Sequence, residues 1–272
     1  MVSCYTPATL DQALALLSQH ALIPYAGGTD LMVEEAPDRA FLFIHALPEL
    51  CAITEDAEYI RFGAAVTFTE VLESPLAPAV LKEAVSQIAA PAIRNTGTLG
   101  GNIGNGSAKA DSALVFFAAD ALLRLASTAG ERIVPIAAFY KGRKKLDLAP
   151  GELIVEILFP KAHNVRHYYH KIGARKALAI SRLAFVGLMD IDAGVIQHYA
   201  IALGAITDVA IRRPDIDAML VGKTVGEAKA LKPAYLAAYS EAIVPIRGRI
   251  SAEYRKSVAL ALLNDFLEIM GI

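Results

Sequence analysis

Cysteine is scarce in this sequence of 272 residues, with only two, Cys4 and Cys51. Zinc sites and iron–sulfur clusters rely on sets of cysteine ligands, so we expect neither on this chain. An excess of charge is also missing, because 26 Lys and Arg stand against 28 Asp and Glu, giving a formal net charge of −2. Without a positive field, binding to nucleic acid or to an anionic membrane is disfavoured. Small molecules and proteins remain as expected partners.

Long apolar runs are absent as well, since no stretch of 18 apolar residues free of charge occurs. Residues 1–7 lack the basic start and apolar run of a signal peptide. We therefore expect a soluble, cytoplasmic protein. With 55% hydrophobic and 20% charged residues, the chain can bury a substantial core, and its length is compatible with two domains.

Several common active-site motifs are missing. Neither the phosphate-loop pattern G-x-x-x-x-G-K-S/T nor the dinucleotide pattern G-x-G-x-x-G occurs, which disfavours kinase-like and Rossmann sites. The nucleophile elbow G-x-S-x-G is not found either, and no set of Ser, His and Asp stands out by its context. If the chain is an enzyme, its chemistry is expected to depend on a bound cofactor.

The periodicity predicts helices mixed with antiparallel strands. Thr9 followed by Gln12 is a capping pattern for a first helix, and a second helix is expected from Leu76 to Ala90, stopped by Pro91. Further helices are expected from Asp111, from Pro214 and at residues 251–270, and strands at residues 21–26, 41–45, 53, 59–62, 121–126, 133–136, 153–159, 184–189 and 195–203. We place a domain boundary near residue 165, after Pro160.

Two glycine-rich segments are the most unusual feature of the chain. The first is Ala26-Gly27-Gly28-Thr29-Asp30, and the second, expected to be a loop, has five glycines and three asparagines between Asn95 and Gly106. We expect both segments to expose backbone amides, which with the hydroxyls of Thr29 and Thr98 could clamp a diphosphate. Two tight turns without a ligand are the alternative, and spacing alone does not decide between them.

Two clusters of basic residues receive less specific interpretations. The neighbourhood of His163, His167 and His170 is expected to be a strand with a surface histidine cluster, because no carboxylate or cysteine lies near to complete a metal shell. The run Lys141-Gly142-Arg143-Lys144-Lys145 is typical of a solvated loop, with docking of an acidic partner or a nucleotide as the other possibility.

Taken together, these segments resemble the FAD-binding subunit of the molybdenum hydroxylases, the family of xanthine dehydrogenase, nicotinate dehydrogenase and the medium subunit of carbon monoxide dehydrogenase. The resemblance covers nearly the whole chain and rests on residues 26–31, 93–103, 110–113, 171–177 and 254–255. The context of residues 104–107 and 111–113 is most similar to the xanthine dehydrogenase-like bacterial subunits. His45 departs from the family pattern and is assigned no role, and two distant cysteines disfavour the benzoyl-CoA branch with its added cluster.

The resemblance implies an α+β fold with a flavin domain of the vanillyl-alcohol-oxidase (PCMH) type. That domain would cover residues 1–165 in two subdomains, about 1–55 and 56–165, and a smaller C-terminal α+β domain would cover residues 166–272. It also implies noncovalent FAD, with Asp111 near the sugar and Ile88, Leu153 and Lys171 along the cofactor. The two diphosphate loops implied by similarity are Ile23, Pro24, Tyr25, Ala26, Gly27, Gly28, Thr29 and Asp30, and Gly97, Thr98, Leu99, Gly100, Gly101 and Asn102.

The family's activity implies partner subunits. A molybdenum cofactor on a large subunit hydroxylates the substrate, [2Fe-2S] clusters on a small subunit carry single electrons, and FAD collects two for NAD or another acceptor. This chain then needs no catalytic side chain of its own and holds no metal. A stand-alone flavin oxidoreductase and a non-catalytic nucleotide-binding module remain as alternatives.

Overall fold

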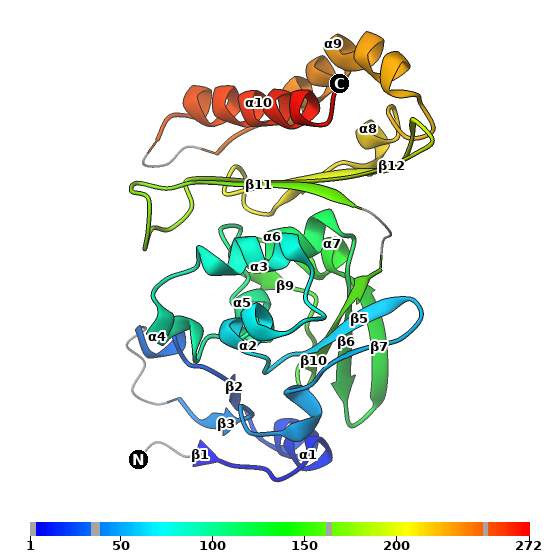
Figure 1. Cartoon of the computed structure of the whole chain (residues 1–272). Helices are drawn as coiled ribbons and strands as arrows, with labels where there is room; N and C mark the ends of the chain where they lie inside the picture. The colour runs from blue at the N-terminus through cyan, green and yellow to red at the C-terminus, as the bar shows by residue number, and fades with distance from the viewer. Residues whose placement is uncertain (1–3, 34–38, 162–164, 247–249) are drawn as a thin grey trace. The chain divides into compact units, whose positions relative to one another are not determined.

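The computed structural model describes residues 4–33, 39–161, 165–246 and 250–272 (Figure 1). The chain divides into two compact units, one formed by Met1–Ser107 and Asp120–Lys161, the other by Ala108–Ala119 and Ala162–Ile272. Each unit combines helices with sheets, which confirms the predicted α+β class. In the described residues, no helix has the length and apolar character needed to cross a membrane.

The first unit begins with a small parallel sheet in the order β1-β3-β2. Helix α1 (Leu10–Gln19) starts at the predicted cap, where the Thr9 side chain accepts a hydrogen bond from the Gln12 amide at 3.3 Å. Its buried face, with Leu14 and Leu17, joins the core of this part of the unit. The remaining elements are β1 (Cys4–Tyr5), β2 (Ile23–Tyr25), β3 (Phe41–Phe43) and the single turns η1 (Leu31–Val33) and η2 (Pro48–Leu50).

A larger antiparallel sheet completes the first unit, in the order β4-β5-β10-β6-β7. The predicted apolar runs at 121–126 and 153–159 are its central strands, and the run at 133–136 ends one residue early because Ile136 starts a helix. The strands are β4 (Ile53–Glu55), β5 (Tyr59–Gly63), β6 (Leu122–Ser127), β7 (Gly130–Pro135) and β10 (Leu153–Pro160).

The segment that connects β5 to β6 differs from the prediction in two places. The helix expected at residues 76–90 is only α3 (Ala79–Ser86), and Pro91 opens the next helix because a missing N–H costs nothing in a first turn. The second glycine-rich segment is not a loop throughout, since residues Leu99–Gly104 form α5, capped by Thr98. The same segment contains α2 (Phe68–Glu73) and α4 (Pro91–Arg94). After β7, the first unit continues with α7 (Ile136–Phe139) and the hairpin of β8 (Tyr140–Gly142) and β9 (Lys145–Leu146).

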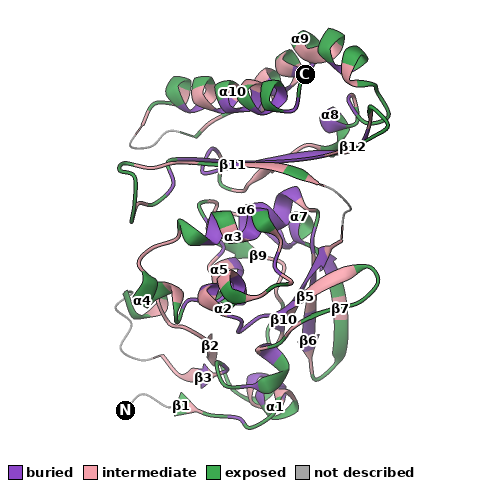
Figure 2. Cartoon of the chain, viewed as in Figure 1, coloured by how far each residue is buried: buried purple, intermediate pink, exposed green. Residues whose placement is uncertain are grey.

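The second unit is an antiparallel sheet, β11-β12-β13-β14, with helices on both faces. Glycines mark where the helices approach: a Cβ added at Gly187 would lie 2.7 Å from the Phe266 ring of α10, and one at Gly204 would lie 3.1 Å from Leu114 of α6. Because both faces are covered, β12 is buried along most of its length (Figure 2). The elements are α6 (Asp111–Ala118), β11 (Arg166–Ile172), β12 (Leu183–Asp192), β13 (Val195–Gly204), β14 (Ile211–Arg212), α8 (Pro214–Asp217), α9 (Val225–Ala242) and α10 (Ala252–Ile269).

Candidate functional site

A cavity of about 390 Å³ in the first unit brings most of the predicted site residues together. This volume lies within the range of small-molecule sites, roughly 300–1,000 Å³. The predicted residues that line it are Ile23, Pro24, Ala26, Gly27, Gly28, Thr29, Asp30, Gly97, Thr98, Gly100, Gly101, Asn102 and Leu153. Residues that the sequence did not single out as a site also line it: Leu31, Ile44, Ala64, Phe68, Gly104, Asn105, Lys144, Leu148 and Ile154.

The first glycine-rich segment leaves β2 in a conformation that requires glycine. Gly28 has φ +66°, and a Cβ there would lie 2.2 Å from the Tyr25 hydroxyl oxygen. A Cβ on Gly27 would lie 1.8 Å from the Thr96 carbonyl oxygen, so this glycine lets the two segments touch. In the described part of the chain, the amides of Gly27, Gly28, Thr29 and Asp30 donate to no protein acceptor. Such a run of amides without protein acceptors, beside a cavity, offers the donors that an anionic oxygen group requires.

The second segment contributes in another way, and the expectation that it too exposes its amides is wrong. The amide of Gly97 donates to the Ile93 carbonyl at 2.7 Å, that of Gly100 to the Ala64 carbonyl at 2.9 Å, and that of Gly101 to the Thr98 hydroxyl at 3.1 Å. The turn after α4 uses the Gly97 amide, and the formation and packing of α5 use those of Gly100 and Gly101. What remains is a surface without side chains, since a Cβ on Gly101 would meet only the Thr98 hydroxyl within 4 Å.

A hydrogen bond between side chains joins the two segments at the cavity. The Asn105 Nδ2 atom donates to Asp30 Oδ2 at 2.5 Å. Asn105 caps the C-terminal end of α5, and Asp30 precedes η1. The contact therefore fixes the first segment to the end of the second, and it engages the carboxylate that lines the cavity.

Three predicted residues of the first unit lie outside the cavity lining. Tyr25 supports it from behind, with its ring under Gly28 and in edge contacts with Phe41 and Phe43. Leu99 is fully buried in the core. Ile88 lies in the turn after α3, where its carbonyl accepts a hydrogen bond from Arg94 Nη1 at 2.7 Å.

The structure brings Asp111 and Lys171 together in the second unit. Lys171 Nζ lies 2.8 Å from Asp111 Oδ2, and both side chains are buried. The Ser181 hydroxyl donates to Asp111 Oδ1 at 2.6 Å. Asp111 also opens α6, where a negative charge is favoured. Both oxygens of this carboxylate thus have partners on the same unit.

The histidine region is a strand, as predicted. His167 and His170 lie on β11, while His163 lies outside the described residues. Throughout the described ranges, no group of three or more His, Cys, Asp or Glu side chains is arranged to hold a metal ion.

Among the additional lining residues, Lys144 lies in the basic run, for which docking of a nucleotide is one of the two interpretations, and Asn105 lies in the glycine–asparagine segment. Phe68 belongs to α2, a helix that the periodicity did not predict. Its position in the cavity depends on a bond between its amide and the Gly97 carbonyl at 3.0 Å, which sequence spacing does not show.

Comparison with known proteins gives matches along both units. The family model of the FAD binding domain in molybdopterin dehydrogenase matches residues 1–162, and that of the CO dehydrogenase flavoprotein C-terminal domain matches residues 168–270. The putative xanthine dehydrogenase FAD-binding subunit XdhB of Escherichia coli is 36% identical, covering 77% of this chain and 76% of the relative. The nicotinate dehydrogenase FAD-subunit of Eubacterium barkeri is 33% identical, covering 80% of this chain and 79% of that one.

Solved structures are similar over almost the full chain. A crystal structure of the Cu,Mo carbon monoxide dehydrogenase in its cyanide-inactivated form has a TM-score of 0.88 at 26% identity, covering 96% of this chain and 94% of that one. Carbon monoxide dehydrogenase from Hydrogenophaga pseudoflava gives 0.87 at 28% identity, with coverages of 96% and 93%. With these matches and a cavity built from two glycine-rich segments, the chain belongs to the family of FAD-binding medium subunits of the molybdenum hydroxylases and is a subunit of an FAD-dependent oxidoreductase.

Proposed function

We propose that this chain binds FAD noncovalently in the cavity of its first unit and serves as the electron-transfer subunit of a xanthine dehydrogenase-like complex. The observation that carries the proposal is the run of undonated amides from Gly27 to Asp30 beside a glycine-lined wall. Hydrogen bonds from amides to a charged phosphate oxygen contribute about 1.5–3 kcal/mol each. A diphosphate group therefore fits the donors and the space present.

In this proposal the residues of the chain bind and orient the cofactor. The amides of the first segment hold the diphosphate, the glycines of α5 allow close approach, and the apolar wall with Ile44, Leu153 and Ile154 excludes water. Asp111 and Lys171 are retained as cofactor-binding residues on the second unit, with Ile88, Tyr25 and Leu99 as supports. When bound, FAD supplies the ability to exchange both single electrons and electron pairs.

The partners in this proposal are a large subunit with a molybdenum cofactor and a small subunit with [2Fe-2S] clusters. Relatives from four organisms are named medium chain or medium subunit, which supports a complex of several chains. With two cysteines, this chain cannot itself supply the ligands of such clusters. We further propose a purine or related heterocycle as substrate, because the relatives named for xanthine dehydrogenase are 36% and 37% identical, against 29% for a carbon monoxide dehydrogenase. NAD or another carrier is the proposed electron acceptor.

We also propose the division of the chain into a flavin domain, residues 1–165, and a C-terminal domain, residues 166–272. The ends of the two family matches at residues 162 and 168 support it. Within the first domain we propose subdomains of about 1–55 and 56–165; the parallel sheet lies in the first, while β4 at its end already pairs with the antiparallel sheet of the second.

Purification from the native host, with an absorbance spectrum, metal analysis and identification of co-eluting chains, tests the proposal. We expect flavin absorbance, molybdenum, iron and two further subunits, with hydroxylation of xanthine only in the complex. A lone flavoprotein that turns over its own substrate at full rate would favour a stand-alone oxidoreductase. Protein that binds ADP but takes up no flavin would instead favour a nucleotide-binding module.

A further inference from the structure

The hairpin β8–β9 carries the basic run to the cavity. Lys144, at the tip of this hairpin, lines the cavity, whereas its neighbours Arg143 and Lys145 do not. Of the described residues that line the cavity, Lys144 and Asp30 are the ones with charged side chains. Asn105 holds the Asp30 carboxylate without neutralising it, and Lys144 is the cationic side chain among the described lining residues.

The position of Lys144 is fixed by its backbone. Its φ is +52°, a left-handed conformation that is uncommon for residues other than glycine and asparagine. Its amide donates to the Gly106 carbonyl at 3.2 Å. Gly106 itself has φ +63°, and a Cβ there would lie 3.0 Å from Lys144 Cα. The last glycine of the second segment is therefore required by contact with the hairpin.

Further contacts hold both ends of the hairpin. The buried Tyr140 hydroxyl donates to the Ile103 carbonyl of α5 at 3.1 Å, and burial raises the pKa of this phenol, so that it keeps its proton. Beyond β9, Arg132 donates to the Asp147 carbonyl at 2.6 Å and to the Glu152 carboxylate at 2.6 Å. The hairpin is thus docked on the element that forms one wall of the cavity.

We propose that Lys144 is a cofactor-binding residue whose ammonium group pairs with the diphosphate of the dinucleotide held in this cavity. The inference rests on the proposed binding of FAD and adds the cation that the amides of the first segment lack. A glycine or asparagine would adopt the left-handed backbone at lower cost, yet neither carries a positive charge. Because Gly106 holds its backbone, the Lys144 side chain starts from a fixed point at the cavity lining.

Titration of flavin-free full-length protein with FAD tests this, using Lys144→Gln against Lys145→Gln. Lys145 is the matched control, because it is exposed on the same hairpin and does not line the cavity. We expect Lys144→Gln to weaken FAD and ADP about five- to tenfold at low salt, with adenosine unchanged. The effect should shrink as ionic strength rises, and Lys145→Gln should behave as wild type.

Each outcome has one meaning. Equal FAD affinity for wild type and Lys144→Gln overturns the inference and leaves the proposed function intact, whereas wild-type protein that binds no FAD refutes the proposed function. An equal loss of adenosine and ADP affinity shows that Lys144 supports the shape of the cavity, which also overturns the inference. Lys144→Gly separates folding from binding: its thermal midpoint without ligand should equal or exceed that of wild type, while FAD binds more weakly. A lower midpoint with unchanged affinity would contradict the inference.

Discussion

Gly28 and Gly101 both line the cavity, but glycine is required at the two positions for different physical reasons, which substitutions can distinguish. Gly28 is constrained by its backbone, with φ +66° and the Tyr25 ring 2.2 Å from a would-be Cβ. Gly101 has no such φ, and its would-be Cβ meets only Thr98 Oγ1, at 2.8 Å. Glycine is therefore required at position 28 by the backbone of the folded chain, and at position 101 by the space that a ligand in the cavity needs.

We therefore expect Gly28→Ala to lower the free energy of unfolding without ligand by at least about 1–2 kcal/mol, the cost of a left-handed residue. Gly101→Val should fold with a smaller loss and weaken FAD binding tenfold or more, because its side chain fills the cradle. Thermal melts and FAD titrations measure both effects. Gly226→Val, on an exposed first turn of α9, is the control that should leave FAD binding unchanged. Wild-type affinity in Gly101→Val would show that the cofactor does not contact this wall.

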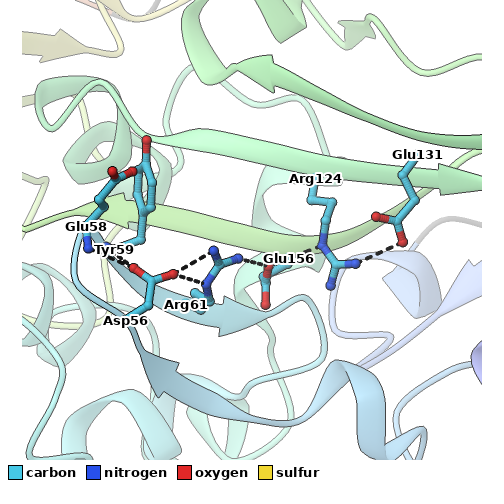
Figure 3. A network of polar contacts seen from close by, with 7 residues as sticks. All are labelled: Asp56, Glu58, Tyr59, Arg61, Arg124, Glu131 and Glu156. Carbon is cyan, nitrogen blue, oxygen red and sulfur yellow. Dashed lines mark hydrogen bonds and ion pairs between the residues drawn. The ribbon is translucent and has the colours of Figure 1, made fainter.

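A ladder of alternating charges crosses the larger sheet at residues Asp56, Arg61, Glu156, Arg124 and Glu131 (Figure 3). Glu156 is shared by Arg61 at 3.0 Å and Arg124 at 3.2 Å. At the end of the ladder, hydrogen bonds from the amides of Tyr59 and Glu58, and then from Arg61, lower the pKa of Asp56 to about 2. Its charged form is therefore favoured in the folded state.

The sign of the resulting pH dependence follows from linkage. Because the pKa of Asp56 falls from 3.8 to about 2 on folding, its contribution to stability is present above about pH 4 and is lost as the pH drops toward 2. The difference in thermal midpoint between wild type and Asp56→Asn should therefore be constant from pH 7 to about pH 5 and shrink below pH 4. Melts of both proteins over this range measure it. A difference that grows on acidification would show that the carboxylate is not the stabilised form.

At the scale of elements, buried Asp217 ties three parts of the second unit together. Lying at the end of α8, it accepts hydrogen bonds from the hydroxyls of Tyr235 and Tyr239 of α9, both at 2.7 Å, and from the amide of Ile201 of β13 at 3.1 Å. Arg212 of β14 pairs with it at 2.5 Å. Burial raises the pKa of Asp217, and these donors oppose that rise.

Replacing this carboxylate removes a charged partner of the buried Arg212 guanidinium and the acceptor of two tyrosine hydroxyls. Asp217→Ala should lower the free energy of unfolding by about 3–5 kcal/mol, as for other broken buried ion pairs. Asp215→Ala is the control on the same short helix, because Asp215 pairs with Arg213 at the surface and should have little effect. Denaturant unfolding of both variants provides the comparison. Similar losses would mean that the helix, and not the buried network, sets the stability.

Element types were predictable where a pattern is local. The cap at Thr9, the antiparallel strands and the last helix follow from spacing within a few residues. The prediction for the second glycine-rich segment was wrong, because its composition indicates a loop. Helix α5 forms there through the Thr98 cap and a hydrogen bond from the Gly100 amide to the Ala64 carbonyl. That acceptor lies far away in sequence. The same reason explains why the sequence revealed the first amide run but not the loss of donors in the second.

At the scale of the whole chain, the unit to which α6 belongs could not be inferred from the order of the elements in the sequence. The helix from Asp111 was predicted, but it groups with residues beyond 162, not with the strands that flank it in sequence. Leu114 packs near Gly204, the Ala205 amide donates to the Ala108 carbonyl at 2.7 Å, and Asp111 neutralises buried Lys171. Such pairings between distant residues leave no signal in local periodicity.

Because α6 belongs to the second unit, we can predict how a fragment of that unit behaves with and without this helix. A fragment of residues 162–272 contains the whole second sheet but lacks α6, so one face of β12 and β13 is uncovered and Lys171 loses the Asp111 carboxylate. We expect this fragment to bind hydrophobic dyes and to melt without a cooperative transition. The same fragment preceded by residues 108–119 on a flexible linker should melt cooperatively, whereas a linked segment with Asp111→Ala and Leu114→Asp should not rescue it. Circular dichroism and dye fluorescence compare the three. A cooperative melt of the fragment without α6 would show that the sheet and its α9–α10 layer suffice, and that the helix is only a covering.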